Sequence, residues 1–176
     1  MVGALGDNDV DVALRITGDD ILVDPSYIDI GLDHHLSTNS EYSDLKDLPS
    51  GTEVEFFDAD LLRNIYKLGE NTDGTEYLTF YITRNKDQFN ISSVPVSEHH
   101  SRSWRLTLDT QEDYKVISKL LLHMSKIGKD LDYRLDDIVS YFEQNPEELK
   151  VNEQVRQRMN PPKVNTTIGW GKALKG

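Results

Sequence analysis

Short runs of β-branched and aromatic residues alternate with helical patterns along much of this 176-residue chain. The first run, 10–17, ends at Gly18, and Asp24 and Pro25 then supply an N-cap and a first-turn proline for a helix. A second run, 53–57, is followed by a helical pattern in the same way. Strands that alternate with helices predict an α/β domain with a mainly parallel sheet flanked by helices.

The later part of the chain predicts further strands and then helices alone. Strands are expected over 89–96 and 104–108, and helices over 114–127, 135–144 and 146–158. Thr110, with Asp113 three residues on, forms a capping-box pattern at the start of the first of these helices. We therefore expect one incomplete α/β domain with a C-terminal helical extension over 1–159 and an irregular tail over 160–176.

Composition excludes several classes of function. The chain carries 31 acidic and 19 basic residues, a formal charge of -12, which disfavours nucleic acid and anionic membrane surfaces as partners. It has no cysteine, so disulfides and thiolate metal sites are excluded. No apolar run approaches the roughly 20 residues that span a bilayer, and the first residues lack the pattern of a signal peptide. These features predict a cytoplasmic protein.

Acidic residues follow two of the predicted strands. Asp19 comes directly after the first strand, and Asp109 after the strand over 104–108. Because ligands of α/β sheets gather at the carboxyl ends of strands, the two carboxylates are suited to hold Mg²⁺, which prefers oxygen ligands. The alternatives are ordinary ones: Asp19 and Asp20 as loop-capping carboxylates, and Asp109 as the residue that precedes a capped helix.

Four segments occur in the same order as in the spore-coat polysaccharide cytidylyltransferases, which are related to CMP-acylneuraminate and CMP-Kdo synthetases. Segment 15–25 reads RITGDDILVDP and resembles the family's RVTGD motif with its later Asp-Pro pair. Segment 105–113 reads RLTLDTQED and resembles RWTVDTPED. Between them, 51–56 is similar to GLDVEV and 76–82 to EHVTPYI.

This resemblance implies a partial glycosyltransferase-A-like nucleotidyltransferase fold, in which a sugar oxygen attacks the α-phosphate of CTP and releases pyrophosphate. Mg²⁺ would be the cofactor. Asp19 and Asp109 match the two metal-binding, catalytic carboxylates of the family. Arg15 and Arg105 match residues near the substrate. Glu53 and Glu55 match the acidic strand beside the sugar site, although two carboxylates on one strand face also suit a solvated surface.

The family pattern begins with a strand and a phosphate-binding loop rich in Arg, Ser and Lys, and nothing of that kind precedes Val10. Tyr77 and Phe80 stand where the family often has His and Pro. Two main hypotheses follow. One is a cytidylyltransferase, or part of one, in polysaccharide or acidic-sugar biosynthesis. The other is a non-catalytic sugar-binding or assembly module that forms a homodimer or joins a complementing chain. An unrelated sugar-binding or glycosyltransferase domain is a third.

Two histidine pairs also invite a metal interpretation. His34 and His35 are adjacent, as are His99 and His100. Adjacent side chains diverge on a helix or strand, and neither pair has a third ligand at a useful spacing in the sequence. We therefore expect both pairs to be surface residues without a metal.

Overall fold

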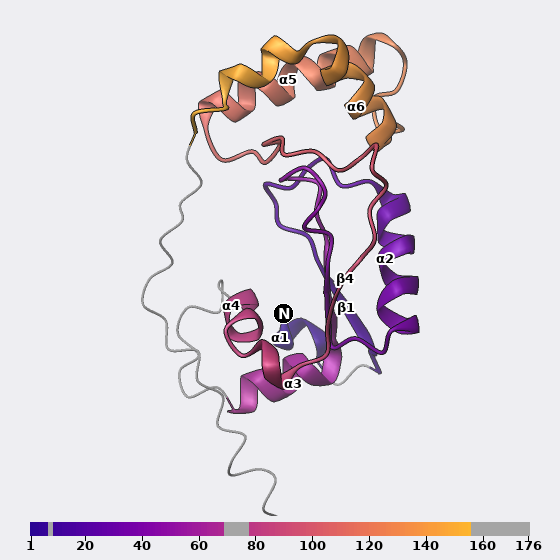
Figure 1. Ribbon diagram of the computed structural model, residues 1–176, viewed down its shortest axis with the longest axis vertical. Coiled ribbons are helices and arrows are strands. Elements are labelled where there is room, and N and C mark those ends of the chain that lie inside the picture. The colour runs from indigo at the N-terminus through magenta and orange to yellow at the C-terminus, as the bar shows by residue number, and fades with distance from the viewer. Residues whose placement is uncertain (7–8, 69–77, 156–176) are drawn as a thin grey trace, which may run out of the picture.

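The computed structural model describes residues 1–6, 9–68 and 78–155, and it has a mixed α/β fold (Figure 1). In chain order the elements are α1 (Val2–Leu5), β1 (Val12–Arg15), α2 (Pro25–Ser37), β2 (Tyr42–Asp44), β3 (Glu55–Asp58), α3 (Ala59–Leu68), α4 (Leu78–Thr83), η2 (Lys86–Gln88), β4 (Ile91–Ser93), α5 (Gln111–Lys126), α6 (Leu135–Gln144) and η3 (Pro146–Val151). The predicted α/β class is thus confirmed. None of the described helices is long and apolar enough to cross a membrane. The predicted tail over 160–176 lies outside the described residues.

The four strands form one open sheet in the order β1-β3-β2-β4. Strand β3 pairs antiparallel with both β1 and β2, and only β2 with β4 is parallel. The expectation of a mainly parallel sheet was therefore wrong. Residues 45–54 join β2 to β3 without a helix, and neighbouring strands joined by such a short connection run antiparallel.

Three of the predicted elements differ from those observed. Within the predicted strand 89–96 only β4 is formed, and segment 104–108 is extended chain that contributes a single bridge between Ser50 and Arg105. The helix predicted over 146–158 is the 3₁₀ helix η3, with 156–158 outside the described residues. Strand β2 was not predicted, because a three-residue strand that contains Ser43 and Asp44 gives no apolar run.

The alternating side chains of β3 point into two separate cores. Phe56 belongs to a large core that also takes in residues of α2, α5 and α6, whereas Phe57 belongs to a smaller core with residues of α1, α3 and α4. Gly31 of α2 lies against the Phe56 ring so closely that an added Cβ would meet it at 2.3 Å. The helix can approach the sheet at this point because it has no side chain there.

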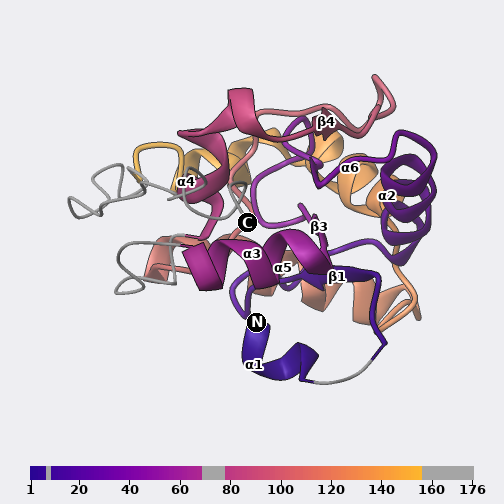
Figure 2. The same ribbon diagram turned by 90° about the horizontal axis from the view of Figure 1, so that it is seen from below.

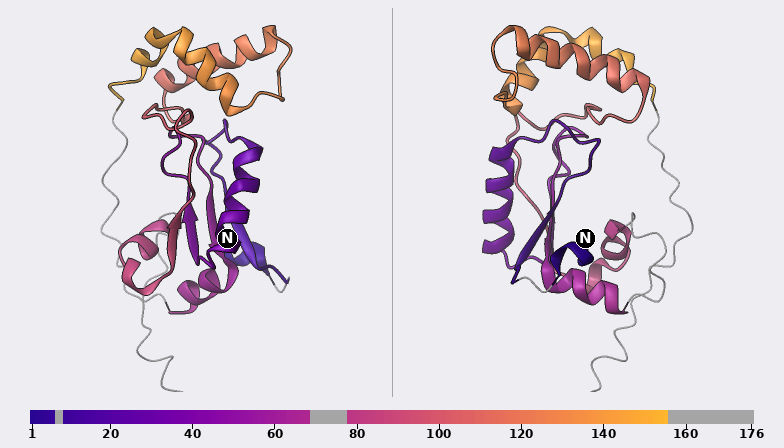
Figure 3. Two further views of the ribbon diagram at one scale, coloured as in Figure 1. Left: turned by 45° about the vertical axis from the view of Figure 1, so that its right-hand side comes forward. Right: turned by 180° about the vertical axis from the view of Figure 1, so that it is seen from behind.

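The helices surround the sheet unevenly. Helix α2 lies along one side and α4 on the opposite side, and views from two directions agree on this (Figure 2). Helices α5 and α6 form a separate layer across one end of the sheet, while α1 and α3 lie near the other end (Figure 3). The loops that precede the α5–α6 layer therefore lie between it and the sheet.

Predicted caps fix the helix starts. The Asp24 carboxylate accepts from Ser26 N at 2.9 Å and caps α2, as expected from the sequence. Its other oxygen accepts from Leu135 N at 2.7 Å, at the first residue of α6. The capping box of Thr110 and Asp113 begins α5. Asp24 thus ties the α5–α6 layer to α2 through one buried carboxylate.

Candidate functional site

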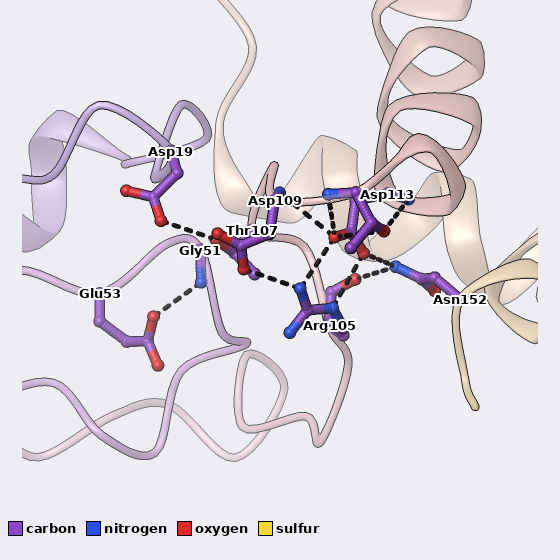
Figure 4. Close-up of polar contacts among 9 residues, drawn as sticks. Asp19, Gly51, Glu53, Arg105, Thr107, Asp109, Asp113 and Asn152 are labelled. Atoms are coloured by element: carbon purple, nitrogen blue, oxygen red, sulfur yellow. Dashed lines mark hydrogen bonds and ion pairs between the residues drawn. The ribbon is translucent and has the colours of Figure 1, made fainter. Parts of the chain in front are cut away.

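Three segments meet between the sheet and α5: the loop after β1, the turn before β3 and segment 104–110 (Figure 4). Leu108 N donates to the Asp19 carbonyl oxygen at 3.0 Å, which joins the first segment to the third. Ser50 N donates to the Trp104 carbonyl at 3.0 Å, and Leu106 N donates to the Ser50 carbonyl at 2.6 Å. Backbone hydrogen bonds therefore hold all three loops together before any side chain is considered.

Gly51 allows the turn before β3 to lie against segment 104–110. Its φ of +99° is in a region that L side chains rarely adopt, and an added Cβ would lie 2.3 Å from the Leu106 backbone carbon. Its N–H donates to the Glu53 side chain at 2.7 Å. The glycine thus sets the distance between Glu53 and the segment that carries Arg105 and Asp109.

Asp19 and Asp109 come together, as their family motifs predict. Thr107 Oγ1 donates to Asp19 Oδ2 at 3.4 Å, and the backbone hydrogen bond from Leu108 N to the Asp19 carbonyl places Asp109 beside Asp19. The pKa of Asp19 is lowered, first by the nearby Thr17 side chain and further by the hydrogen bond from Thr107. Asp19 is therefore held as a carboxylate beside a second acidic group.

Asp20, the next residue, behaves in the opposite way. Burial raises its pKa, and the nearby Asp19 and Asp109 charges add to the effect. The Thr17 hydroxyl donates to its Oδ2 at 2.5 Å and partly offsets the cost. The loop after β1 thus presents one stabilised carboxylate and one that is poorly neutralised.

Asp113 is the best-neutralised carboxylate of the site. Its side chain is fully buried and accepts hydrogen bonds from six groups: Arg105 Nε at 2.9 Å, Arg105 Nη2 at 2.8 Å, Asn152 Nδ2 at 2.8 Å, Thr110 Oγ1 at 2.9 Å, Thr110 N at 3.0 Å and Asp109 N at 3.2 Å. Burial alone would raise its pKa, but the hydrogen bonds from Arg105, Asn152 and Thr110 outweigh it and lower the pKa to about 2. Asp113 therefore holds the first turn of α5 together with Arg105 and Asn152.

Arg105 is the main partner of Asp113 and also binds Asp109. Its Nη2 donates to Asp109 Oδ2 at 2.7 Å, and the guanidinium makes a two-point contact with Asp113. These carboxylates raise the pKa of Arg105, with the Asp113 hydrogen bonds as the largest cause. The described contacts of Arg105 thus hold Asp109 in place, and its predicted role in binding substrate stays a prediction.

Two pockets adjoin this cluster. The first encloses about 340 Å³ and is lined by Lys46, Leu48, Ser50, Glu53, Arg102, Ser103, Trp104, Arg105 and Val155. The second encloses about 240 Å³ and is lined by Arg15, Thr17, Asp20, Tyr42, Asp44, Leu45, Lys46, Glu53 and Glu55. Lys46 and Glu53 belong to both linings. The two pockets are therefore neighbouring parts of one polar cleft.

Glu53 and Glu55 both line the second pocket, but only one is fully engaged by the protein. Glu55 pairs with Arg15 at 2.5 Å and accepts from Tyr42 Oη at 2.8 Å and Thr79 Oγ1 at 2.7 Å. For Glu53, burial raises the pKa to about 7 against a weaker lowering by the Gly51 N–H. Glu53 is thus the carboxylate of the cleft that has most to gain from a ligand's donor.

Three further residues of the site were not predicted from the sequence. Lys46 is exposed at the edge of both pockets, and within the described part of the chain its ammonium makes no hydrogen bond or ion pair. Thr107 binds Asp19, and Asn152 joins the Arg105 carbonyl to Asp113. Thr107 lies inside the RLTLD segment and could have been found there, but nothing in the local sequence marks Lys46 or Asn152.

The Asp19–Asp109 pair suits a hard divalent cation. Two neighbouring carboxylates repel each other unless a cation or proton lies between them. Mg²⁺ commonly binds one or two carboxylates and shares its remaining positions with water and substrate phosphates. Both side chains supply oxygen atoms, the ligand type that Mg²⁺ prefers. The residues therefore fit the metal that the family motifs imply.

No protein-family model matches the sequence, but two curated proteins are similar to it. An uncharacterized protein of Methanocaldococcus jannaschii is 31% identical over 149 residues, covering 84% of this chain and 60% of that protein. The spore coat polysaccharide biosynthesis protein SpsF of Bacillus subtilis is 29% identical over 138 residues, covering 77% of this chain and 56% of that protein. The chain thus spans somewhat more than half the length of these relatives.

A solved structure shares the fold. A cytidylyltransferase from Leptospira borgpetersenii superposes with a TM-score of 0.75 over 89% of this chain and 65% of its own, at 22% sequence identity. The chain has a cytidylyltransferase-like fold. This confirms the family resemblance and fold class expected from the four motifs. The cytidylyltransferase-like fold brings together residues 90 positions apart, and the roles assigned to Asp19 and Asp109 within it remain predictions.

Proposed function

We propose that this chain forms the metal- and sugar-binding part of a cytidylyltransferase that acts in polysaccharide or acidic-sugar biosynthesis, with CTP and a sugar as substrates. The observation that carries the proposal is that hydrogen bonds from Thr107 and Leu108 hold Asp19 beside the segment that carries Asp109, next to a polar cleft. The similarity to a protein named for spore coat polysaccharide biosynthesis and to the fold of a cytidylyltransferase supports it.

In this proposal Asp19 and Asp109 hold Mg²⁺, which would neutralise charge on the phosphates during transfer. Thr107 orients Asp19 by its hydrogen bond, and Arg105 holds the Asp109 carboxylate. Because the reaction needs no covalent intermediate with the protein, positioning and electrostatics supply most of the rate. The rigid Asp113 hub contributes by keeping Arg105, and through it Asp109, in one place.

The cleft supplies the sugar site in this proposal. Glu53 accepts a hydrogen bond from a sugar hydroxyl, which would compensate for the burial of its carboxylate. Lys46, on the edge of both pockets, would attract the carboxylate of an acidic sugar. Arg15 supports the site indirectly, because its ion pair holds Glu55 in the wall of the cleft.

The test is calorimetric titration of CTP into the chain with and without Mg²⁺. We expect binding that depends on Mg²⁺ and that Asp19→Asn and Asp109→Asn weaken by at least tenfold, because each removes one metal ligand. Asp33→Asn, on the exposed face of α2, is the matched control and should bind as the wild type does. Circular dichroism confirms that each variant is folded. Binding that is unchanged in both site variants would refute the metal role.

A second candidate is a non-catalytic sugar-binding or assembly module. The polar cleft favours it, because Glu53 and Lys46 would bind a sugar there whether or not CTP is bound. A pyrophosphate-release assay over acidic sugars separates the two functions. Sugar binding without CTP binding or pyrophosphate release, together with a defined oligomer by sedimentation, would favour the module.

A further inference from the structure

Three metal-ligating side chains converge outside the cleft. His99 and His100 lie in the turn after β4, and Asp136 lies in the first turn of α6. The Asp136 Oδ1 atom is 2.7 Å from His100 Nε2 and 3.7 Å from His99 Nε2, and one ligand atom from each residue falls within 4.8 Å of the others. The chain that leaves β4 reaches α6 at this point (Figure 1). The sequence shows no third ligand at a useful spacing for this pair, and the fold supplies a candidate, Asp136, from 36 residues further along.

The chemistry of this set differs from that of the Asp19–Asp109 pair. Two imidazole nitrogens and one carboxylate are typical ligands of Zn²⁺ and similar transition metals, whereas Mg²⁺ prefers oxygen atoms alone. Three protein ligands also leave a position for water or a further group. The site would therefore select a different metal from the one proposed for the cleft.

Tyr27 orients one of the ligands. Its hydroxyl is 2.8 Å from His100 Nδ1 and accepts from Ser97 N at 3.3 Å. When Nδ1 carries the proton and donates to the Tyr27 oxygen, the lone pair of Nε2 points toward Asp136. Tyr27 is buried, so its hydroxyl is held in place beside the His100 ring. Histidine metal ligands regularly donate a hydrogen bond of this kind from the ring nitrogen that does not bind the metal.

Among the described residues, the Asp136 carboxylate forms no ion pair with a lysine or arginine. Arg102 is close in sequence to the two histidines, and Arg134 is close to Asp136. However, Arg102 pairs with Glu143 and Arg134 pairs with Asp132. Among the described residues the ion-pair partners of Asp136 are the two histidines alone. A hydrogen-bonded chain of Tyr27, His100 and Asp136 would account for His100 by itself, but not for the approach of the second imidazole to the same oxygen.

We propose that His99, His100 and Asp136 bind a transition metal of the Zn²⁺ class at the surface, with Tyr27 as the residue that positions His100. The metal joins the turn at 97–101 to the start of α6. It therefore links the chain that leads into segment 104–110 to the helical layer, at a place separate from the cleft. If this site binds no metal, the proposed cytidylyltransferase function is unaffected. If the chain proves not to bind CTP, the proposed metal site is likewise unaffected.

The test is calorimetric titration of Zn²⁺ into the full chain in a non-chelating buffer with excess Mg²⁺, which occupies carboxylate-only sites. We expect one site, weakened at least tenfold by His99→Ala and by Asp136→Ala. His123→Ala is the control, because this histidine contacts the Tyr141 ring and not the cluster. Tyr27→Phe keeps the ring and removes the hydroxyl, and should weaken binding by about 10–100-fold.

A second measurement of metal binding uses Co²⁺, whose visible absorption spectrum depends on its nitrogen and oxygen ligands. The wild type and His123→Ala should develop the same spectrum, and His99→Ala should not. The proposal is overturned if the wild type binds no Zn²⁺, or if His99→Ala and Asp136→Ala bind it as tightly as His123→Ala does. Equal affinity of Tyr27→Phe and the wild type would overturn the positioning role of Tyr27.

Discussion

Asp113 and Glu53 lie at opposite ends of one polar cluster and carry their charges in opposite ways (Figure 4). Asp113 is fully buried, and Glu53 is half-buried in the wall of the cleft. Asp113 accepts hydrogen bonds from Arg105, Asn152 and other donors, which lower its pKa to about 2. Glu53 accepts from the Gly51 N–H, and burial raises its pKa to about 7. Burial therefore does not decide whether a carboxylate is stable in this protein; the number and charge of its donors do.

The difference separates structure from function. A carboxylate with all its donors in place has little to offer a ligand, and it holds its neighbours rigidly. A buried carboxylate that lacks donors costs stability, and such groups occur preferentially where a ligand will supply what is missing. On this argument Asp113 is the support of the site and Glu53 is a point of contact for substrate.

Removing the support should have the largest effect. Asp113→Ala leaves Arg105 without its two-point partner and Asn152 without an acceptor in a buried place. Breaking one side of a buried ion pair usually costs about 3–5 kcal/mol, and we expect a loss in this range. Urea denaturation followed by circular dichroism measures it.

Asp109→Asn is the matched control, because the same Arg105 binds this carboxylate at an exposed position. Exposed ion pairs contribute about 0–1 kcal/mol, so its stability should change little. Equal losses in the two variants would mean that Asp113 is not the structural centre of the cluster. The comparison with Glu53 would then lose its basis.

A second variant, Gly51→Ala, should increase the distance between Glu53 and segment 104–110. Gly51→Ala places a methyl group 2.3 Å from the Leu106 backbone at a φ of +99°. The strain should cost about 2–3 kcal/mol and move Glu53 away from segment 104–110. Thermal unfolding measures the cost, and Gly128→Ala is the control, since it also has positive φ, at +76°, but meets nothing within 4 Å. If Gly51→Ala costs no more than this control, close backbone approach does not set the geometry.

Local features of the fold were readable from the sequence. Caps at Asp24 and Thr110 depend on a few neighbouring residues, and the structure confirms both. The meeting of Asp19 with Asp109 was also expected, because each lies in a family motif that ends near a strand. Short-range patterns and motif order were sufficient in these cases.

Non-local features were not readable. The antiparallel direction of β3 depends on β2, whose three residues carry no strand signal. Lys46 and Asn152 join the site through packing between distant segments, and nothing near them in the sequence indicates it. The third ligand of the His99–His100 pair was missed for the same reason, since α6 had first to be placed beside the turn.

The sharpest test of the comparison is Glu53→Gln, which removes the charge and keeps the shape. The pKa of Glu53 rises from its ordinary 4.5 to about 7 on folding. The stability that the protonated side chain contributes is therefore fully present below pH 4.5 and is lost as the pH rises through 7, where the buried group becomes charged. Gln imitates the protonated acid, and we expect the variant to be more stable by about 1–3 kcal/mol at pH 8, with the gain disappearing near pH 4.5. Urea denaturation at pH 8, 6 and 4.5 measures this.

Glu55→Gln is the matched control on the same strand. It weakens hydrogen bonds and an ion pair with Arg15 and should be destabilised at pH 8 by about 1–2 kcal/mol. Opposite signs for two identical substitutions two residues apart would show that the cleft leaves Glu53 short of donors while Glu55 is satisfied. A loss of stability in Glu53→Gln at pH 8 would mean that this carboxylate already has its partners within the protein, and the assignment of Glu53 to the sugar would lose its physical basis.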